Sequence, residues 1–206
     1  GPALDDETEL LDGTSWTEVA DMSTARFTMT RGPTGTISAA VAAGGAVPAV
    51  SALTEEWNFS STLAAGAWAT GTVLNTGRDS HSQASYATRD TAFVFGGNGA
   101  QVNAETYDGS SWTEVGNINT GRQGGGGAGI QTSAILATGG YPTPTVNVES
   151  WDNSSWTEVA NVNTARRQIH GAGTTNASAL IAGGQPHPDN AEAEQWNDTS
   201  WTEVGD

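Results

Sequence analysis

Cysteine and lysine are both absent from this sequence of 206 residues. Without Cys the chain can form no disulfide, no thiolate metal site and no cysteine-based catalytic centre. Its seven basic residues are all Arg and stand against 23 acidic residues, which gives a formal net charge of −16. Because binding to nucleic acids and to anionic membranes depends on Lys and Arg, we expect neither as a partner.

Long aliphatic side chains and long apolar runs are scarce as well. No run approaches the roughly 18 apolar residues of a membrane-spanning helix, so we expect no membrane insertion. Sustained helical periodicity is missing, whereas Ala, Gly, Thr, Ser and Asn are abundant. A Leu-rich helical core is excluded, and the fold is expected to be all-β.

What the chain does contain is a repeat. The same phrase occurs as TSWTEVADMSTAR (14–26), SSWTEVGNINTGR (110–122), SSWTEVANVNTAR (154–166) and, shorter, TSWTEVGD (199–206). An irregular copy keeps the frame, since Trp68 lies as far before Arg78 as Trp112 lies before Arg122. Between the phrases, a Gly pair and a Glu-x-aromatic motif recur in the same order. The motifs are EEW (55–57), ETY (105–107), ESW (149–151) and EQW (194–196), with a degraded ELL at 9–11.

Each repeat unit predicts four short strands. In 123–166, the runs GGGAGIQ, SAILATGG, VNVESW and SWTEV are separated by polar turns, and Trp and Val favour strands. Four antiparallel strands every 44 residues are typical of a β-propeller blade. The units 27–78, 79–122, 123–166 and 167–206 are therefore predicted to be blades of a single domain spanning 1–206, and 4–26 a half blade of two outer strands.

These landmarks resemble kelch-type repeats. The Gly pair after the second strand, the aromatic residue of the third strand and the Trp of the fourth carry the resemblance over nearly the whole chain. The wording SWTEV…NTAR is also similar to kelch-like repeats of structural proteins from tailed phages and aquatic bacteria. The resemblance implies a propeller, but kelch blades serve oxidases, cytoskeletal proteins and adaptors alike, so it implies no single function.

The repeated carboxylates and Arg residues are candidates for structural ion pairs. A Glu that shares a strand face with a packed aromatic residue is partly buried and needs a partner. We expect bidentate pairing, within or between blades, and the alternative is solvated charge on a strand face. The residues concerned are Glu9, Glu55, Glu105, Glu149 and Glu194 with Arg26, Arg78, Arg122 and Arg166.

The Trp residues are predicted to form the blade core, because few other large side chains are available. A sugar-stacking platform is the alternative. Core positions are expected for Trp16, Trp57, Trp112, Trp151, Trp156, Trp196 and Trp201. Trp68, Tyr141 and His187 lie in or near variable loops and are candidates for ligand binding at a rim.

No pattern in the sequence predicts catalysis, a cofactor or a metal site. The segment GGGG at 124–127 has neither the Lys nor the following helix of a phosphate loop, and we expect it to line a crowded axis. His81, His170 and His187 are not spaced as metal ligands. The copper site of kelch-type sugar oxidases cannot be carried over to a chain without Cys.

The half blade suggests how the chain works. It can stand as an incomplete fifth blade, pair with another subunit, or belong to a longer array, and unpaired strand edges favour association. We expect a non-enzymatic structural or interaction module on a virion or another extracellular surface, binding itself or another surface protein. The alternatives are a carbohydrate-binding propeller for neutral glycans and a purely architectural fibre subunit.

Overall fold

The computed structural model describes residues 5–11, 13–28, 35–47, 49–59, 66–186 and 191–205. The described part is all-β, as predicted, and its one helical element is the short 3-10 turn η1 (Arg89–Thr91). The described strands form four antiparallel sheets of four strands each, together with the hairpin β1–β2 and the small ribbon β5–β6. The strands of each sheet lie within one repeat unit.

The sheets follow the order of the chain. The hairpin comprises β1 (Glu9–Leu11) and β2 (Trp16–Glu18). The first sheet comprises β3 (Gly35–Thr36), β4 (Ala39–Ala43), β7 (Thr54–Phe59) and β8 (Gly66–Thr70). The separate ribbon comprises β5 (Ala46–Val47) and β6 (Ala49–Val50). The second comprises β9 (Ser82–Gln83), β10 (Phe93–Phe95), β11 (Ala104–Tyr107) and β12 (Trp112–Val115). The third comprises β13 (Gly126–Ile130), β14 (Ser133–Ala137), β15 (Val148–Trp151) and β16 (Trp156–Val159), and the fourth β17 (His170–Thr175), β18 (Ser178–Ala182), β19 (Ala193–Trp196) and β20 (Trp201–Glu203).

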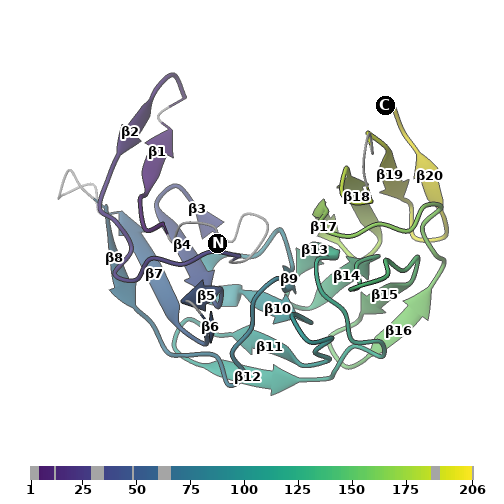
Figure 1. Cartoon of the computed structure of the whole chain (residues 1–206), viewed down its shortest axis with the longest axis horizontal. Coiled ribbons are helices and arrows are strands. Elements are labelled where there is room, and N and C mark those ends of the chain that lie inside the picture. The colour runs from purple at the N-terminus through teal and green to yellow at the C-terminus, as the bar shows by residue number, and fades with distance from the viewer. Residues whose placement is uncertain are drawn as a thin grey trace.

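The sheets are arranged around an open arc (Figure 1). The strands β3, β9, β13 and β17 line its inner side, and β8, β12, β16 and β20 lie at its outer rim. Glycine permits the inner strands to approach closely, because a Cβ atom on Gly127 would lie 2.1 Å from the carbonyl oxygen of Gln83. This is the structural role predicted for the Gly run.

The core lies between consecutive sheets rather than in one central mass. Phe93 and Phe95 of the second sheet are fully buried, and the ring of Phe95 lies 4.9 Å from that of Trp156 in the third sheet. Trp151 packs on Phe93 with ring centroids 5.6 Å apart. Burial of both faces is what makes the middle sheets mutually dependent.

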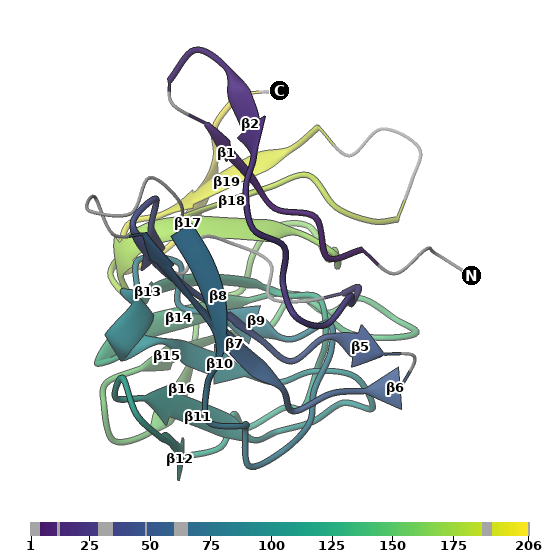
Figure 2. The same cartoon turned by 90° about the vertical axis from the view of Figure 1, so that its left-hand side faces the viewer.

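The two ends of the arc do not meet. Figure 1 shows the hairpin β1–β2 at one end and the fourth sheet at the other, with a gap between them. Figure 2 shows the hairpin rising above β7 and β8 of the first sheet. The sheet array is therefore open, and each end of the described chain presents a surface without a neighbouring sheet.

Two local elements differ from the sequence prediction. The variable loop 46–54 contains the ribbon β5–β6, and the second unit has a first strand of only two residues followed by the turn η1. In that turn the Thr88 backbone N–H donates to Thr91 Oγ1 at 3.1 Å. Local bonds of Thr88 and Thr91 close this turn, and the Tyr86 N–H donates to the Gly129 carbonyl of the third sheet at 2.8 Å, so this segment does not extend the second sheet.

Candidate functional site

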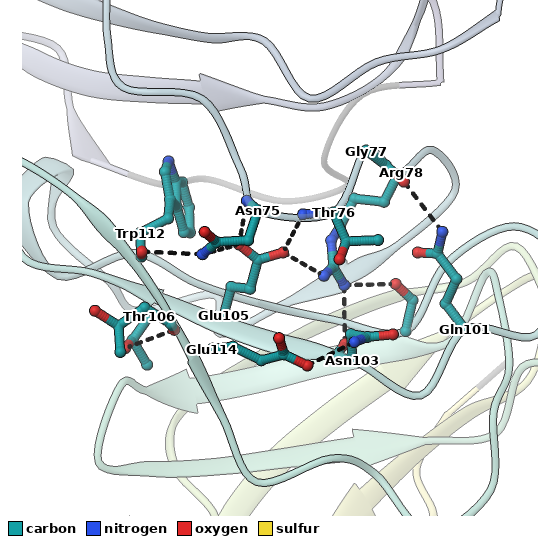
Figure 3. Close-up of polar contacts among 12 residues, drawn as sticks. Asn75, Thr76, Gly77, Arg78, Gln101, Asn103, Glu105, Thr106, Trp112 and Glu114 are labelled. Atoms are coloured by element: carbon teal, nitrogen blue, oxygen red, sulfur yellow. Dashed lines mark hydrogen bonds and ion pairs between the residues drawn. The ribbon is translucent and has the colours of Figure 1, made fainter.

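A buried Arg–Glu pair forms at each passage from one sheet to the next, and Arg78 with Glu105 shows its geometry (Figure 3). The Arg78 guanidinium donates to Glu105 Oε1 at 2.7 Å and to the carbonyl oxygens of Gly96 and Asn103, both at 2.9 Å. Both side chains are fully buried. The Arg lies after the fourth strand of one unit and the Glu in the third strand of the following sheet.

The other three repeated pairs follow the same rule. Arg122 Nη1 donates to Glu149 Oε1 at 2.7 Å, and Arg26 pairs with Glu55 and Arg166 with Glu194. In each case the Arg also donates to one or two backbone carbonyl groups of the following repeat unit. The sequence alone did not decide between pairing within a unit and pairing with the adjacent one; the chain pairs the Arg with the following sheet.

The same carboxylate binds the backbone and side chain of an Asn that sequence reasoning overlooked. Glu105 Oε2 accepts from the Asn75 backbone N–H at 2.7 Å and from Asn75 Nδ2 at 3.0 Å, and Oε1 accepts from the Thr76 N–H at 3.1 Å. Asn75 Nδ2 also donates to the carbonyl oxygen of Trp112 at 3.0 Å (Figure 3). The motif NT(A/G)R is therefore a single recognition unit, which we call the latch. Its members are Asn75, Thr76, Arg78 and Glu105 with their counterparts in the other units, Asn119–Glu149 and Asn163–Glu194, and Ser23 replaces Asn in the first one.

Burial and pairing act in opposite directions on the charged groups of the latch. Burial by itself would raise the pKa of the Glu55 carboxyl, but the Ser23 hydrogen bonds and the Arg26 guanidinium outweigh it and hold that pKa below its ordinary value. Burial lowers the pKa of Arg78 and of Arg122, and the partner carboxylates oppose the change. Each hydrogen bond that these side chains form offsets part of the free energy needed to remove the two charges from water.

Glu9 is an exception, and its predicted ion pair is wrong. It lies in β1 at the position equivalent to Glu55, but it is exposed and forms no ion pair with a described Arg. The rule of the latch explains the difference, because each paired Glu takes the Arg that precedes its own sheet, and the described residues hold no such Arg ahead of Glu9. Its cross-strand partner in the hairpin is Glu18.

The Trp residues of the fourth strands pack on the preceding sheet. Trp112 donates from Nε1 to Thr54 Oγ1 at 3.1 Å and joins a core cluster with Val41 and Ala43 of the first sheet. Trp156 packs on Phe93 and Phe95, and Trp201 on the residues of the third sheet. The third-strand residue Trp151 also packs on the preceding sheet, through Phe93, and in addition its Nε1 donates to the Gln131 carbonyl of its own sheet at 3.0 Å. The core positions predicted for Trp57, Trp112, Trp151, Trp156, Trp196 and Trp201 are all buried.

Trp16 does not belong to the core, so the prediction for it is wrong. Its side chain is 64% exposed, whereas that of Trp156 at the equivalent position is 5% exposed. Trp16 pairs across the hairpin with Leu11, which is also exposed and stands where the other units have an aromatic residue. The cause is positional: no sheet in the described chain precedes the hairpin, so these two side chains lack the sheet that covers their counterparts in the other units.

Beside the hairpin lies an apolar groove of about 490 Å³. Trp68 forms part of its wall and donates from Nε1 to Thr8 Oγ1 at 3.0 Å, the contact that Trp112 makes with Thr54. At the other junctions this space holds the inner strands of the preceding sheet, but the hairpin has only its two outer strands. We call this space the groove, and its lining residues are Thr8, Glu9, Leu10, Leu11, Trp16, Val19, Thr36, Ile37, Ala40, Trp57 and Trp68.

At the opposite end of the arc, one face of the fourth sheet is uncovered. The burial of β18 alternates, with Ala179 and Ile181 buried against the third sheet and Leu180 42% exposed. In the register of the sheet, Leu180 lies opposite Ala172 on one side and Gln195 on the other. We call Ala172, Leu180, Ala182 and Gln195 the terminal face, and a shallow hollow of about 340 Å³ lies over part of it.

The three candidates for a rim site do not come together. Trp68 lies in the groove, and its ring centroid is 5.6 Å from that of Trp57. Tyr141 is largely exposed, and the Arg167 guanidinium stacks over its ring at 4.8 Å. His187 lies outside the described residues. Trp68 thus contacts the segment of the hairpin through Thr8, whereas Tyr141 contacts Arg167.

The remaining polar side chains of the inner side form no described metal cluster. His81 is fully buried, and desolvation, aided by Arg78, lowers the pKa of its imidazole to about 3. His170 is exposed at the start of β17. Within the described ranges no group of three or more His, Cys, Asp or Glu side chains is placed to hold a metal ion, and no helix has the length and apolarity to cross a membrane.

Comparison with protein-family models and with curated proteins finds no match for this sequence. The functional argument therefore rests on the two open ends of the arc.

Proposed function

We propose that this chain is a kelch-like β-propeller module with a non-enzymatic structural or interaction role on a virion or another extracellular surface. Each four-stranded sheet serves as a blade, and β1–β2 serves as a half blade. The repeated latch supports the blade assignment because it gives every four-stranded sheet the same entry. The Gly residues of β13 and β17 support it as well, because they let the inner strands β9, β13 and β17 approach closely.

One observation carries the proposed role: within the described residues, both ends of the arc present surfaces without a neighbouring sheet (Figure 1). The hairpin β1–β2 has a strand edge without a partner among the described strands, and the groove lies beside it. Sheet edges and apolar faces of this kind favour association with another polypeptide. The module therefore assembles or binds through its ends and loops.

A carbohydrate-binding role is the second candidate, and the groove favours it. Trp16, Trp57 and Trp68 all line the groove, together with the polar side chains of Thr8 and Glu9. Aromatic rings with a few polar groups suit a neutral glycan. Against it stands the repeat: at the other junctions the equivalent Trp residues are buried between sheets, so a binding site of one kind is not repeated in every unit.

The test uses the whole chain, because Arg26 closes the latch with Glu55 and a truncation before β3 would leave that carboxylate buried without its partner. Light scattering from about 1 μM to about 1 mM measures self-association, and Trp fluorescence titrations with neutral oligosaccharides measure glycan binding. A mass that rises with concentration supports the structural role. Saturable fluorescence changes with a constant monomer mass support the glycan role. A protein that stays monomeric and binds none of the oligosaccharides overturns the proposal.

A further inference from the structure

We propose that the hairpin β1–β2 of one copy of this chain docks on the terminal face of a second copy. The inference rests on the proposed structural role and identifies its partner and both surfaces. Leu11 and Trp16 provide one surface, and Ala172, Leu180, Ala182 and Gln195 provide the other. The contact joins unlike ends, so it is head-to-tail.

The middle of the chain shows what covers a face of this type. Positions in the second strands are equivalent when counted back from the turn that follows them, so Leu180 and Ala182 correspond to Ile135 and Ala137 of the third sheet. Ile135 and Ala137 are fully buried, in the same cluster as Trp201 of the following sheet. The corresponding residues of the second sheet, Phe93 and Phe95, are covered by Trp156 in the same way.

The first sheet follows this rule too, since Val41 and Ala43 share a cluster with Trp112 of the second sheet. Three consecutive junctions thus cover the second strand of one sheet with the fourth-strand Trp of the next. The terminal face is the corresponding surface that has no such cover within the described residues.

The hairpin carries the matching side chains. Trp16 occupies the fourth-strand position of Trp112, Trp156 and Trp201, and Leu11 occupies the third-strand position of Trp151. Trp16 is 64% exposed and Leu11 41%. One chain therefore carries both halves of its own repeated junction, and in Figure 1 they lie at opposite ends of the gap.

The arrangement of the ends favours a second copy as the partner. A surface at one end of an arc that fits the other end of an identical arc makes a heterologous contact, which produces closed rings or growing chains. The interface comprises one hairpin on one sheet, so it is small and the association is weak. The net charge of −16 makes two copies repel each other, and screening of this repulsion by salt strengthens their association.

Two point variants divide the contact between them. Trp16→Ala removes the hairpin contact and leaves the terminal face, while Leu180→Asp places a charge on the terminal face and leaves the hairpin. Both side chains are exposed, so folding is retained and is checked by circular dichroism. Tyr86→Ala is the matched control, because Tyr86 is also 64% exposed but lies outside both surfaces.

The experiment is sedimentation velocity from about 1 μM to about 1 mM, at about 0.05 M and about 0.5 M NaCl. We expect the wild type and Tyr86→Ala to associate, more strongly at high salt, and each contact variant to associate about 30-fold more weakly. An equimolar mixture of Trp16→Ala and Leu180→Asp has one intact contact and should stop at the dimer.

Different results would separate this inference from the proposed function. Association of the wild type that neither variant weakens would overturn these surfaces and leave the structural role standing. A mixture that stays monomeric would exclude the head-to-tail contact. A wild type that is monomeric throughout the range would overturn the second copy as partner, and the glycan titration then judges the proposed function.

Discussion

The latch depends on the particular chemistry of Arg and Glu. Arg78 offers a planar set of donors, and it satisfies one carboxylate oxygen and two carbonyl groups at once. The carboxylate in turn accepts from Asn75 and Thr76, so few of its lone pairs are left without a donor. A buried pair of this kind tolerates the loss of one partner poorly, because the other charge stays behind.

The first prediction concerns the middle of the chain. Arg122→Met leaves Glu149 buried without a cation and should lower the free energy of unfolding by about 3–5 kcal/mol. Urea denaturation measures the change. Arg89→Met is the control, since Arg89 pairs with Asp90 at a partly exposed site and should cost less than about 1 kcal/mol. An equally small effect of both changes would contradict the structural role of the latch.

His81 provides the second prediction. Burial lowers the pKa of its imidazole to about 3, below the value of 6.5 for an unperturbed His, so the unfolded chain binds more protons between these two pH values. Stability from this group is complete above pH 6.5 and falls as the pH decreases toward 3. Between pH 7 and pH 5 the loss should be about 2 kcal/mol.

The measurement for His81 is urea denaturation at both pH values. His81→Gln should lose much less stability than the wild type on acidification. The exposed His170 gives the control, since His170→Gln should keep the wild-type difference. If the wild type and His81→Gln lose stability equally, another group titrates in this range.

At the scale of the strand, the sheets are joined into an array by side chains that pack on the neighbouring sheet. The sequence places Trp at the same position of each fourth strand, and the register aligns it with the aromatic residue of the third strand, as for Trp156 and Trp151. The turn after the second strand keeps the spacing. There Gly96 has φ +67, and a Cβ atom on it would lie 2.5 Å from the Arg122 carbonyl oxygen. Thr138 takes the equivalent position in the third sheet, and its hydroxyl group donates to the Arg166 carbonyl instead.

Two equivalent Trp residues should therefore differ in their effect on stability. Trp156→Ala removes a buried ring from the contact of the second and third sheets and should cost about 3–5 kcal/mol. Trp16→Ala, measured in dilute monomeric protein, should cost about 0.5 kcal/mol or less because the ring is exposed. Chemical denaturation of both variants tests the difference. Similar losses would mean that Trp16 is buried in solution.

The array as a whole is stabilised mainly between neighbours, as in other repeat proteins. Among the described strands, the third sheet has a neighbour on each face, the fourth has one on a single face, and the hairpin is a two-stranded element with no preceding sheet. The four-stranded sheets all have the same antiparallel arrangement of backbone hydrogen bonds. Local stability should nevertheless fall toward the ends of the arc, because the end sheets have fewer neighbours.

Amide hydrogen exchange should reveal this gradient. In dilute protein, the amides of β14 should exchange at least about tenfold more slowly than those of β18, and the amides of β1 and β2 should exchange fastest. Both β14 and β18 are central strands of four-stranded sheets, so their ladders are matched controls. Uniform protection along the chain would indicate that the ends are covered, by closure of the arc or by a partner.

Much of this organisation could be read from the residues alone. The recurrence of SWTEV, of the Gly pair and of Glu-x-aromatic predicted the strands of each sheet, because period and turn chemistry are local properties of a chain. The same recurrence predicted the buried ion pairs, since one Arg and one Glu appear in each unit. The expected bidentate geometry is wrong, because each of the four Arg residues reaches its Glu through a single N–H···O contact and donates other N–H groups to backbone carbonyls. The Asn of the latch was present in the motif NT(A/G)R, but its bond to a carboxylate some 30 residues later carries no local signal.

Burial, in contrast, depends on neighbours in space. Trp16 and Trp156 stand in the same phrase, yet one is exposed and the other is buried, because only Trp156 has a preceding sheet with inner strands to pack on. Glu9 and Glu149 differ for the same reason, since Arg122 pairs with Glu149 and the described residues hold no Arg ahead of Glu9. The repeated sequence thus determined the strands of each unit and the residues that form its contacts. Only the tertiary structure, an open arc, determined which of these residues have no neighbouring sheet to contact.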